Sequence, residues 1–224
     1  MPVGTLKRNV FLVGFMGVGK TTVARRLARD LGVVAIDVDS YLARKHGKDA
    51  TQLFRQRGER ALRGLEARAL AECAALGPAV ISCGEGIVAT PEARELIKRE
   101  GFAVMLESSE AASLGRIRSL RTRPLLAQGC DTSCLWNERK PLYEEVADAL
   151  IDVRGKSTAA VAAELARMLV REGVYAGSDS GAQPAGEPSK KRGRSRRGRR
   201  GRGRKASGAG NGESSANGPA NATA

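Results

Sequence analysis

The sequence has few histidines and cysteines, and it has no long apolar run. It contains one histidine and four cysteines, and these do not form the Cys/His set of a zinc site. No apolar run approaches the roughly 18 residues that a membrane-spanning helix needs, and no N-terminal segment has the pattern of a cleavable signal. We therefore expect a cytoplasmic protein with free thiols and no membrane contact.

Positive charge is concentrated toward the C-terminal end. The formal net charge is +14, and residues 177–224 hold 11 Lys and Arg against 3 Asp and Glu. Residues 190–205 contain no apolar side chain, so they cannot bury enough surface to offset their ordering entropy. We expect a disordered basic tail over 176–224. It has no aromatics to stack on bases, which leaves two roles open: non-specific contact with RNA or another polyanion, or a merely solvated tail.

Residues 1–175 alternate apolar runs with amphipathic segments, which predicts one α/β domain. Strands are expected over residues 10–13, 33–37, 79–83, 102–106 and 149–153. Helices are expected over 23–31, 40–76 with breaks near Gly47 and Gly58, 91–100, 137–148 and 158–170. Such alternation indicates a five-stranded parallel sheet flanked by helices, with ligands bound beyond the carboxyl ends of the strands.

Residues 14–21, GFMGVGKT, fit the phosphate-binding pattern G-x-x-x-x-G-K-[ST] between a predicted strand and a predicted helix. Glycines let backbone N–H groups face phosphate oxygens, and the start of the helix adds its positive dipole end. We expect Lys20 to reach the β- and γ-phosphates and Thr21 to hold Mg²⁺. The phosphate contacts expected from this loop are Gly17, Val18, Gly19, Lys20, Thr21 and Thr22.

Two carboxylates, Asp37 and Asp39, lie at the end of the second predicted strand. If the chain stays extended there, both point to the same side, one toward Mg²⁺ and the other toward a substrate hydroxyl whose proton it takes. The alternative is that Asp39 or Ser40 simply caps a helix. Arg63 and Glu66 lie three residues apart on a predicted helix, where a solvated ion pair is the simplest interpretation.

Five motifs in order resemble the shikimate kinase family, a group of small P-loop kinases. They are residues 14–22, 36–39 (IDVD), 62–66 (LRGLE), 122–126 (TRPLL) and 139–143 (RKPLY), and the likeness covers about residues 8–172. The resemblance implies ATP-dependent phosphorylation of the 3-hydroxyl of shikimate with Mg²⁺, by a protein expected to be a monomer.

The resemblance also implies a role for each matching residue. Asp37 corresponds to the metal-side carboxylate, and Asp39 to the group that holds the substrate hydroxyls and acts as base. Arg63 and Arg139 correspond to the clamp on the substrate carboxylate, with Gly86 beside them. Arg123 corresponds to the lid arginine that reaches the phosphates, and Arg116 to the one that packs on adenine. The expected catalytic residues are Lys20, Asp39 and Arg123.

One position departs from the family pattern. The family has three glycines after its third strand, whereas this chain has Gly84-Glu85-Gly86. Glu85 brings bulk and negative charge to the place where an anionic substrate is expected, and misplaced like charge costs several kcal/mol. Two alternatives therefore stay open: a P-loop kinase of another hydroxylated substrate, and a weakly catalytic nucleotide-binding protein tethered to RNA by its tail.

Overall fold

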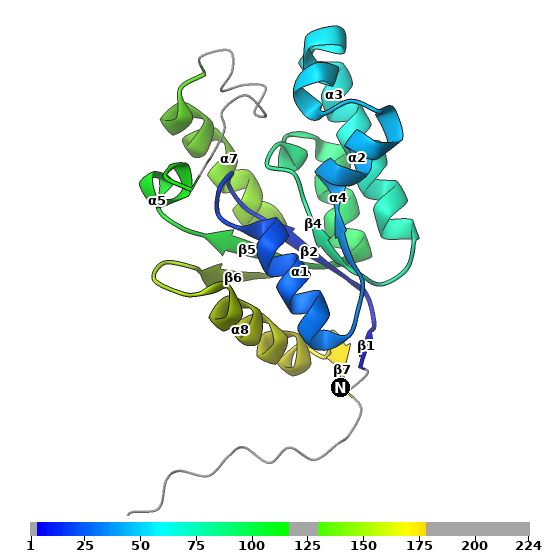
Figure 1. Ribbon diagram of the computed structural model, residues 1–224, viewed down its shortest axis with the longest axis vertical. Coiled ribbons are helices and arrows are strands. Elements are labelled where there is room, and N and C mark those ends of the chain that lie inside the picture. Colours follow the sequence, from blue (N-terminus) through cyan, green and yellow to red (C-terminus); the bar gives the residue numbers. More distant parts are fainter. Residues whose placement is uncertain (1–3, 117–129, 178–224) are drawn as a thin grey trace, which may run out of the picture. The chain divides into compact units, whose positions relative to one another are not determined.

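The computed structural model describes residues 4–116 and 130–177 (Figure 1). Its central sheet contains β2 (Asn9–Val13), β3 (Ala35–Asp37), β4 (Val80–Ser82), β5 (Gly101–Glu107) and β6 (Ala149–Asp152). The strands lie in the order β3-β4-β2-β5-β6 and all pair in parallel, which confirms the predicted sheet. The sequence did not indicate the antiparallel pair of β1 (Thr5–Leu6) and β7 (Tyr175–Ala176). The predicted tail lies outside the described residues, apart from its first two positions.

The helices between these strands are α1 (Lys20–Leu31), α2 (Val38–His46), α3 (Ala50–Ala75), α4 (Pro91–Glu100), α5 (Glu110–Leu114), α7 (Thr132–Val146) and α8 (Thr158–Arg171), with a 3₁₀ turn η1 (Ile87–Ala89). Both predicted breaks are confirmed, because α2 ends at Gly47 with φ 62° and α3 is interrupted at Gly58 with φ 76°. Helix α7 begins earlier than predicted because Asp131 caps it by accepting a hydrogen bond from Ser133 N. No helix in the described part of the chain is long and apolar enough to cross a membrane.

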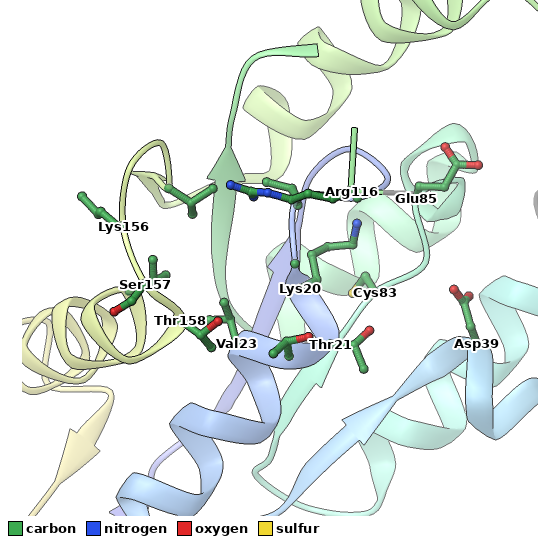
Figure 2. A pocket seen from close by; sticks show the side chains of 16 residues that line it. Lys20, Thr21, Val23, Asp39, Cys83, Glu85, Arg116, Lys156, Ser157 and Thr158 are labelled. Atoms are coloured by element: carbon green, nitrogen blue, oxygen red, sulfur yellow. The ribbon is translucent and has the colours of Figure 1, made fainter. Parts of the chain in front are cut away.

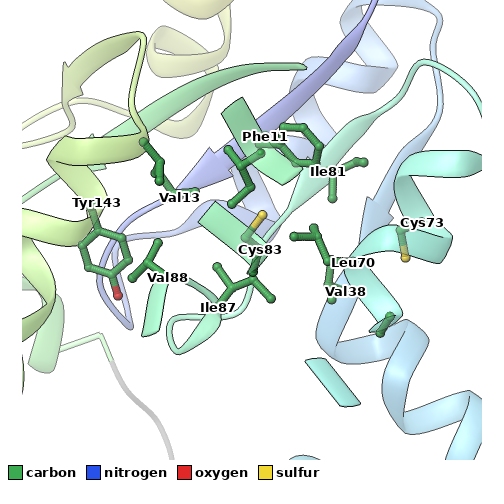
Figure 3. Packing of buried hydrophobic residues seen from close by; sticks show 14 of the residues in the cluster. Phe11, Val13, Val38, Leu70, Cys73, Ile81, Cys83, Ile87, Val88 and Tyr143 are labelled. Carbon is green, nitrogen blue, oxygen red and sulfur yellow. The ribbon is translucent and has the colours of Figure 1, made fainter. Parts of the chain in front are cut away.

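Each face of the sheet has its own core, as expected when side chains alternate along a buried strand. Phe11 and Val13 point to the face that α2, α3, α4 and α7 cover, and Val10 and Leu12 point to the face under α1 and α8. Figure 3 shows the first core, where Phe11 and Ile81 of the sheet pack with Leu70 of α3. With both faces covered, the carboxyl ends of the strands are left to build a site.

Candidate functional site

The P-loop joins β2 to α1 and directs backbone groups toward the start of the helix. Gly14 has φ 135°, and a Cβ there would collide with the carbonyl oxygen of Leu106. Gly19, with φ 104°, is the N-cap of α1, so Lys20 is the first helical residue. The Lys20 ammonium donates to the carbonyl oxygens of Gly14, at 2.6 Å, and Phe15, at 3.0 Å. A helix N-terminus with a lysine beside it suits a phosphate group.

A cavity of about 530 Å³ opens beside this helix start (Figure 2). Most of the predicted nucleotide contacts line it, namely Gly17, Val18, Gly19, Lys20, Thr21, Thr22 and Arg116. Asp39 and Glu85 line the same cavity, although they were predicted to contact the substrate rather than the nucleotide. The cavity therefore brings two of the predicted acceptor-binding residues to the phosphate-binding ones, whereas Arg63, Gly86 and Arg139 do not line it.

The opposite wall of the cavity comes from the loop after β6 and the start of α8. Its residues are Val153, Lys156, Ser157, Thr158 and Val161, none of which the sequence analysis singled out. The signal that points to them is topological. They follow the carboxyl end of a parallel strand, at the same edge of the sheet as the P-loop.

Asp37 ends β3 and uses its two carboxylate oxygens differently. Oδ1 accepts hydrogen bonds from Ser40 N and Ser40 Oγ, at 2.9 and 2.7 Å, so Asp37 is the N-cap of α2. Oδ2 accepts from Thr21 Oγ1 at 2.7 Å, and Thr21 Oγ1 lies 3.2 Å from Ser82 Oγ. Burial alone would raise the pKa of Asp37, but hydrogen bonds from Ser40, Thr21 and Ser82 outweigh it and lower the pKa. An ionised carboxylate beside two hydroxyls is the hard oxygen donor set that Mg²⁺ prefers.

Asp39 does not follow an extended chain, which corrects the alternation argument. β3 stops at Asp37 and α2 starts at Val38, so Asp39 occupies the first turn of a helix. The alternative was also wrong about the cap, which is Asp37 rather than Asp39 or Ser40. The Asp39 carboxylate nevertheless lines the cavity and lies against Gly84, where a Cβ would collide with it. The helical turn, not strand alternation, places Asp39 in the site.

Arg63 and Glu66 form a buried pair rather than the solvated pair that spacing suggested. Their side chains are 12% and 8% exposed, and Arg63 Nη1 donates to Glu66 Oε2 at 2.8 Å. Arg63 Nη2 also donates to Glu59 Oε1 at 3.2 Å. Burial would lower the pKa of Arg63, but the charges of Glu66 and Glu85 outweigh it and raise the pKa. The guanidinium packs so closely on Gly86 that a Cβ there would collide with it.

Glu66 should make stability depend on pH. Burial raises its pKa to about 7 from an ordinary value of 4.5, despite the opposing charge of Arg63. Between those two values the folded chain holds a proton that the unfolded chain has lost, so this residue makes stability fall as pH rises. Glu66→Gln should therefore gain stability relative to the parent between about pH 5 and 7, by up to about 3 kcal/mol at about 1.4 kcal/mol per pKa unit. Urea unfolding of both proteins across this range tests it, and parallel pH profiles would contradict it.

The turn formed by residues 84–86 joins α7 to the site. Arg139, only 3% exposed, donates from Nη1 to the carbonyl oxygen of Gly86 at 3.4 Å. Tyr143 Oη donates to the carbonyl oxygen of Glu85 at 2.6 Å, a role that the sequence analysis did not assign. The Glu85 side chain is itself 9% exposed, and its Oε2 has no hydrogen-bond partner among the described residues. Glu85 therefore does not turn outward to solvent.

Other predicted features lie around this site. Trp136 of α7 packs edge-to-face on Phe15 of the P-loop, with ring centroids 4.9 Å apart. All four cysteines are free; Cys130 and Cys134 are exposed, and no group of three or more His, Cys, Asp or Glu side chains placed to hold a metal ion occurs in residues 4–116 and 130–177. Arg123 lies outside the described residues.

Comparison with known proteins identifies relatives of this chain. A family model described as shikimate kinase matches residues 16–170. A shikimate kinase from Psychrobacter sp. (strain PRwf-1) is 37% identical over 147 residues, which span 64% of this chain and 82% of that protein. Shikimate kinase 1 from Salmonella newport (strain SL254) is 35% identical over 167 residues, which span 73% of this chain and 96% of that protein.

Solved structures give a similar result. Shikimate kinase from Acinetobacter baumannii in complex with shikimate superposes with a TM-score of 0.69 at 32% identity, covering 74% of this chain and 94% of that one. Shikimate kinase from Aquifex aeolicus gives a TM-score of 0.65 at 30% identity, covering 74% of this chain and 98% of that one.

Proposed function

This chain belongs to the shikimate kinase family, and on that premise we propose how its residues phosphorylate shikimate with ATP. It is a phosphotransferase with an alcohol acceptor, and the acceptor position that we propose is the 3-hydroxyl. Family membership favours this function over the two alternatives that the sequence left open. The residue roles that follow are part of the proposal.

The observation that carries the proposal is a set of buried polar atoms beside the P-loop cavity. Arg63 Nε, Arg139 Nε and Glu85 Oε2 are buried and make no hydrogen bond to the described residues, although Arg139 Nε lies 3.3 Å from Glu138 Oε1 in an ion pair. Buried polar groups normally have partners, so such a set indicates a ligand or ordered water. Two guanidinium donors and one carboxylate acceptor complement a molecule that carries both a carboxylate and hydroxyl groups. Shikimate is such a hydroxy acid.

The nucleotide occupies the cavity with its phosphates at the start of α1. Lys20 exchanges its bonds to the Gly14 and Phe15 carbonyls for the β- and γ-phosphates. Thr21 and Asp37 would hold Mg²⁺, with Ser82 in reach of the same hydroxyl, and the ion would neutralise charge on the phosphates. Arg116 packs on the base, and Arg123 reaches the transferring phosphate.

The acceptor lies in the cavity beside the residue 84–86 turn, within reach of Asp39. Arg63 and Arg139 bind its carboxylate, because guanidinium donors can contact two oxygens at once. Asp39 accepts a hydrogen bond from the reacting hydroxyl and takes its proton as phosphate is transferred. Gly84 and Gly86 let Asp39 and Arg63 pack directly on the turn, since any side chain there would displace them. Only the middle position of the turn has room for a side chain, and Glu85 fills it.

A coupled assay of ADP release tests the function itself. ADP should appear only when both ATP and shikimate are present, and NMR of the product should show a phosphate on the 3-hydroxyl. Quinate and gluconate serve as comparison acceptors, because each carries a carboxylate and hydroxyls on a different skeleton. A higher kcat/KM for either of them would favour the alternative substrate that Glu85 raised.

Glu85 should contribute to acceptor binding, so its removal should weaken the binding of shikimate. A hydrogen bond between a hydroxyl and a charged group is worth about 1.5–3 kcal/mol, so Glu85→Gly should raise the KM for shikimate by roughly tenfold or more. Glu85→Gln, which keeps an acceptor oxygen and the shape, should lie between that variant and the parent. The KM for ATP should change less than threefold in both. Tighter shikimate binding by Glu85→Gly would show instead that Glu85 competes with the substrate carboxylate.

A further inference from the structure

The outer face of α3 carries arginines that have no role in the phosphoryl-transfer site. Arg57, Arg60 and Arg68 line a hollow of about 520 Å³ together with Ala61, Gly64 and Leu65. We call these six residues the arginine hollow. All three arginines are exposed, and no acidic side chain lines the hollow. Its positive charge therefore faces solvent.

The acidic residues of α3 do not neutralise these arginines. Glu59 and Glu66 both pair with Arg63, at 3.2 and 2.8 Å, on the side of the helix that faces the active site. Glu72 instead accepts hydrogen bonds from Lys45, at 2.5 Å, and from Tyr41, at 2.8 Å. Within the described residues, Arg57, Arg60 and Arg68 have no ion pair within 4.0 Å.

The floor of the hollow is open between these side chains. Ala61 and Gly64 are small, and a Cβ added at Gly64 would meet nothing within 4 Å. Arg60 and Arg68 are separated by about 12 Å along the helix axis, at about 1.5 Å per residue. Three guanidinium groups spread over this length can each contact a different phosphate, so the arrangement fits a chain of phosphates.

We propose that the arginine hollow binds the phosphodiester backbone of a nucleic acid strand. Guanidinium groups suit phosphate because their donors contact two oxygens at once. No aromatic side chain lines the hollow, so bases have nothing to stack on and binding is independent of sequence. An acidic protein partner fits less well, because Leu65 alone offers an apolar anchor and protein interfaces depend on larger ones. The proposal is independent of the kinase reaction.

Fluorescence anisotropy with the full-length chain tests this, using labelled 20-nucleotide single strands of mixed-sequence RNA and of the matching DNA. The test variant is Arg57→Gln/Arg60→Gln/Arg68→Gln. The control variant, Arg29→Gln/Arg99→Gln/Arg171→Gln, loses the same charge from exposed positions on α1, α4 and α8. Both variants keep the basic segment at residues 190–205, so its contribution is the same in each comparison.

The test variant should bind at least tenfold more weakly than the parent at 0.1 M salt. Its dependence of log K on log salt should become less steep by about 2, because three phosphate contacts are lost and each contributes about 0.7 to the slope on a single strand. The control variant should change less than threefold, and shikimate kinase activity should be unchanged in both. Equal losses in the two variants, or no loss in the test variant, would overturn the proposal. Binding of either strand supports it, and the ratio of RNA to DNA affinity tells which one the hollow takes.

A single substitution provides an independent check if the triple variant does not fold. Ala61→Glu places a carboxylate among the three arginines at an exposed helical position, where glutamate is well tolerated. It should weaken binding by about the same factor as removal of one arginine. An unchanged affinity in this variant would count against the hollow as the contact surface.

Discussion

Lys20→Ala should lower kcat by at least about a thousandfold, the upper end of the cost of losing one preorganised donor at a reacting centre. The ammonium sits at the start of α1, within the cavity that Thr21, Asp39 and Glu85 also line. Its loss removes positive charge from the β- and γ-phosphates, and no other P-loop side chain supplies a charge there. Steady-state kinetics with shikimate and ATP measure the effect.

The structure adds a control that the motif alone does not suggest. Lys20 also bonds the carbonyl oxygens of Gly14 and Phe15, so its removal could loosen the P-loop as well as remove charge. Lys20→Arg keeps the charge, and its melting temperature and activity separate the two effects. Lys98→Ala is the matched control, because Lys98 is half-exposed on α4 and, within the described part of the chain, pairs only with Glu145. Activity of Lys20→Ala within a few-fold of the parent would contradict the assignment of this residue to the phosphates.

Arg63→Ala and Arg139→Ala should each raise the KM for shikimate by roughly 10- to 150-fold, with much less effect on the KM for ATP. The factor corresponds to about 1.5–3 kcal/mol for a hydrogen bond to a charged group. Both guanidinium groups pack on the residue 84–86 turn, and each has a buried Nε that makes no hydrogen bond to the described residues. Arg167→Ala, at an exposed position on α8, is the control for loss of one arginine.

Arg63 needs a second variant, because its removal leaves the buried Glu66 unpaired. An unpaired buried charge destabilises the fold, which can raise KM without any lost contact to substrate. Arg63→Ala should therefore also be measured with Glu66→Gln, where no charge is left behind. If the shikimate defect disappears in the double variant, Arg63 serves the fold rather than the substrate. Equal effects on both substrates would lead to the same conclusion.

Local sequence patterns were sufficient to predict the α/β class, the five parallel strands and the P-loop. These features depend on local patterns: apolar runs, helical periodicity, and glycines that allow the backbone angles of Gly14 and Gly19. The breaks at Gly47 and Gly58 were also predictable, because glycine adopts positive φ without strain. Motif order along the chain was enough to identify the family.

The assembly of the site depends on contacts between distant segments, which local patterns do not predict. Asp39 reaches the cavity because α2 begins directly after Asp37, and a helix start depends on which carboxylate caps it. Arg63 and Glu66 are buried because the residue 84–86 turn, from another part of the chain, packs over them. Glu85 is 9% exposed, and Tyr143 of α7, from a distant part of the chain, holds its carbonyl oxygen. Burial and hydrogen bonding between distant segments set these outcomes, and spacing within one segment carries no information about either.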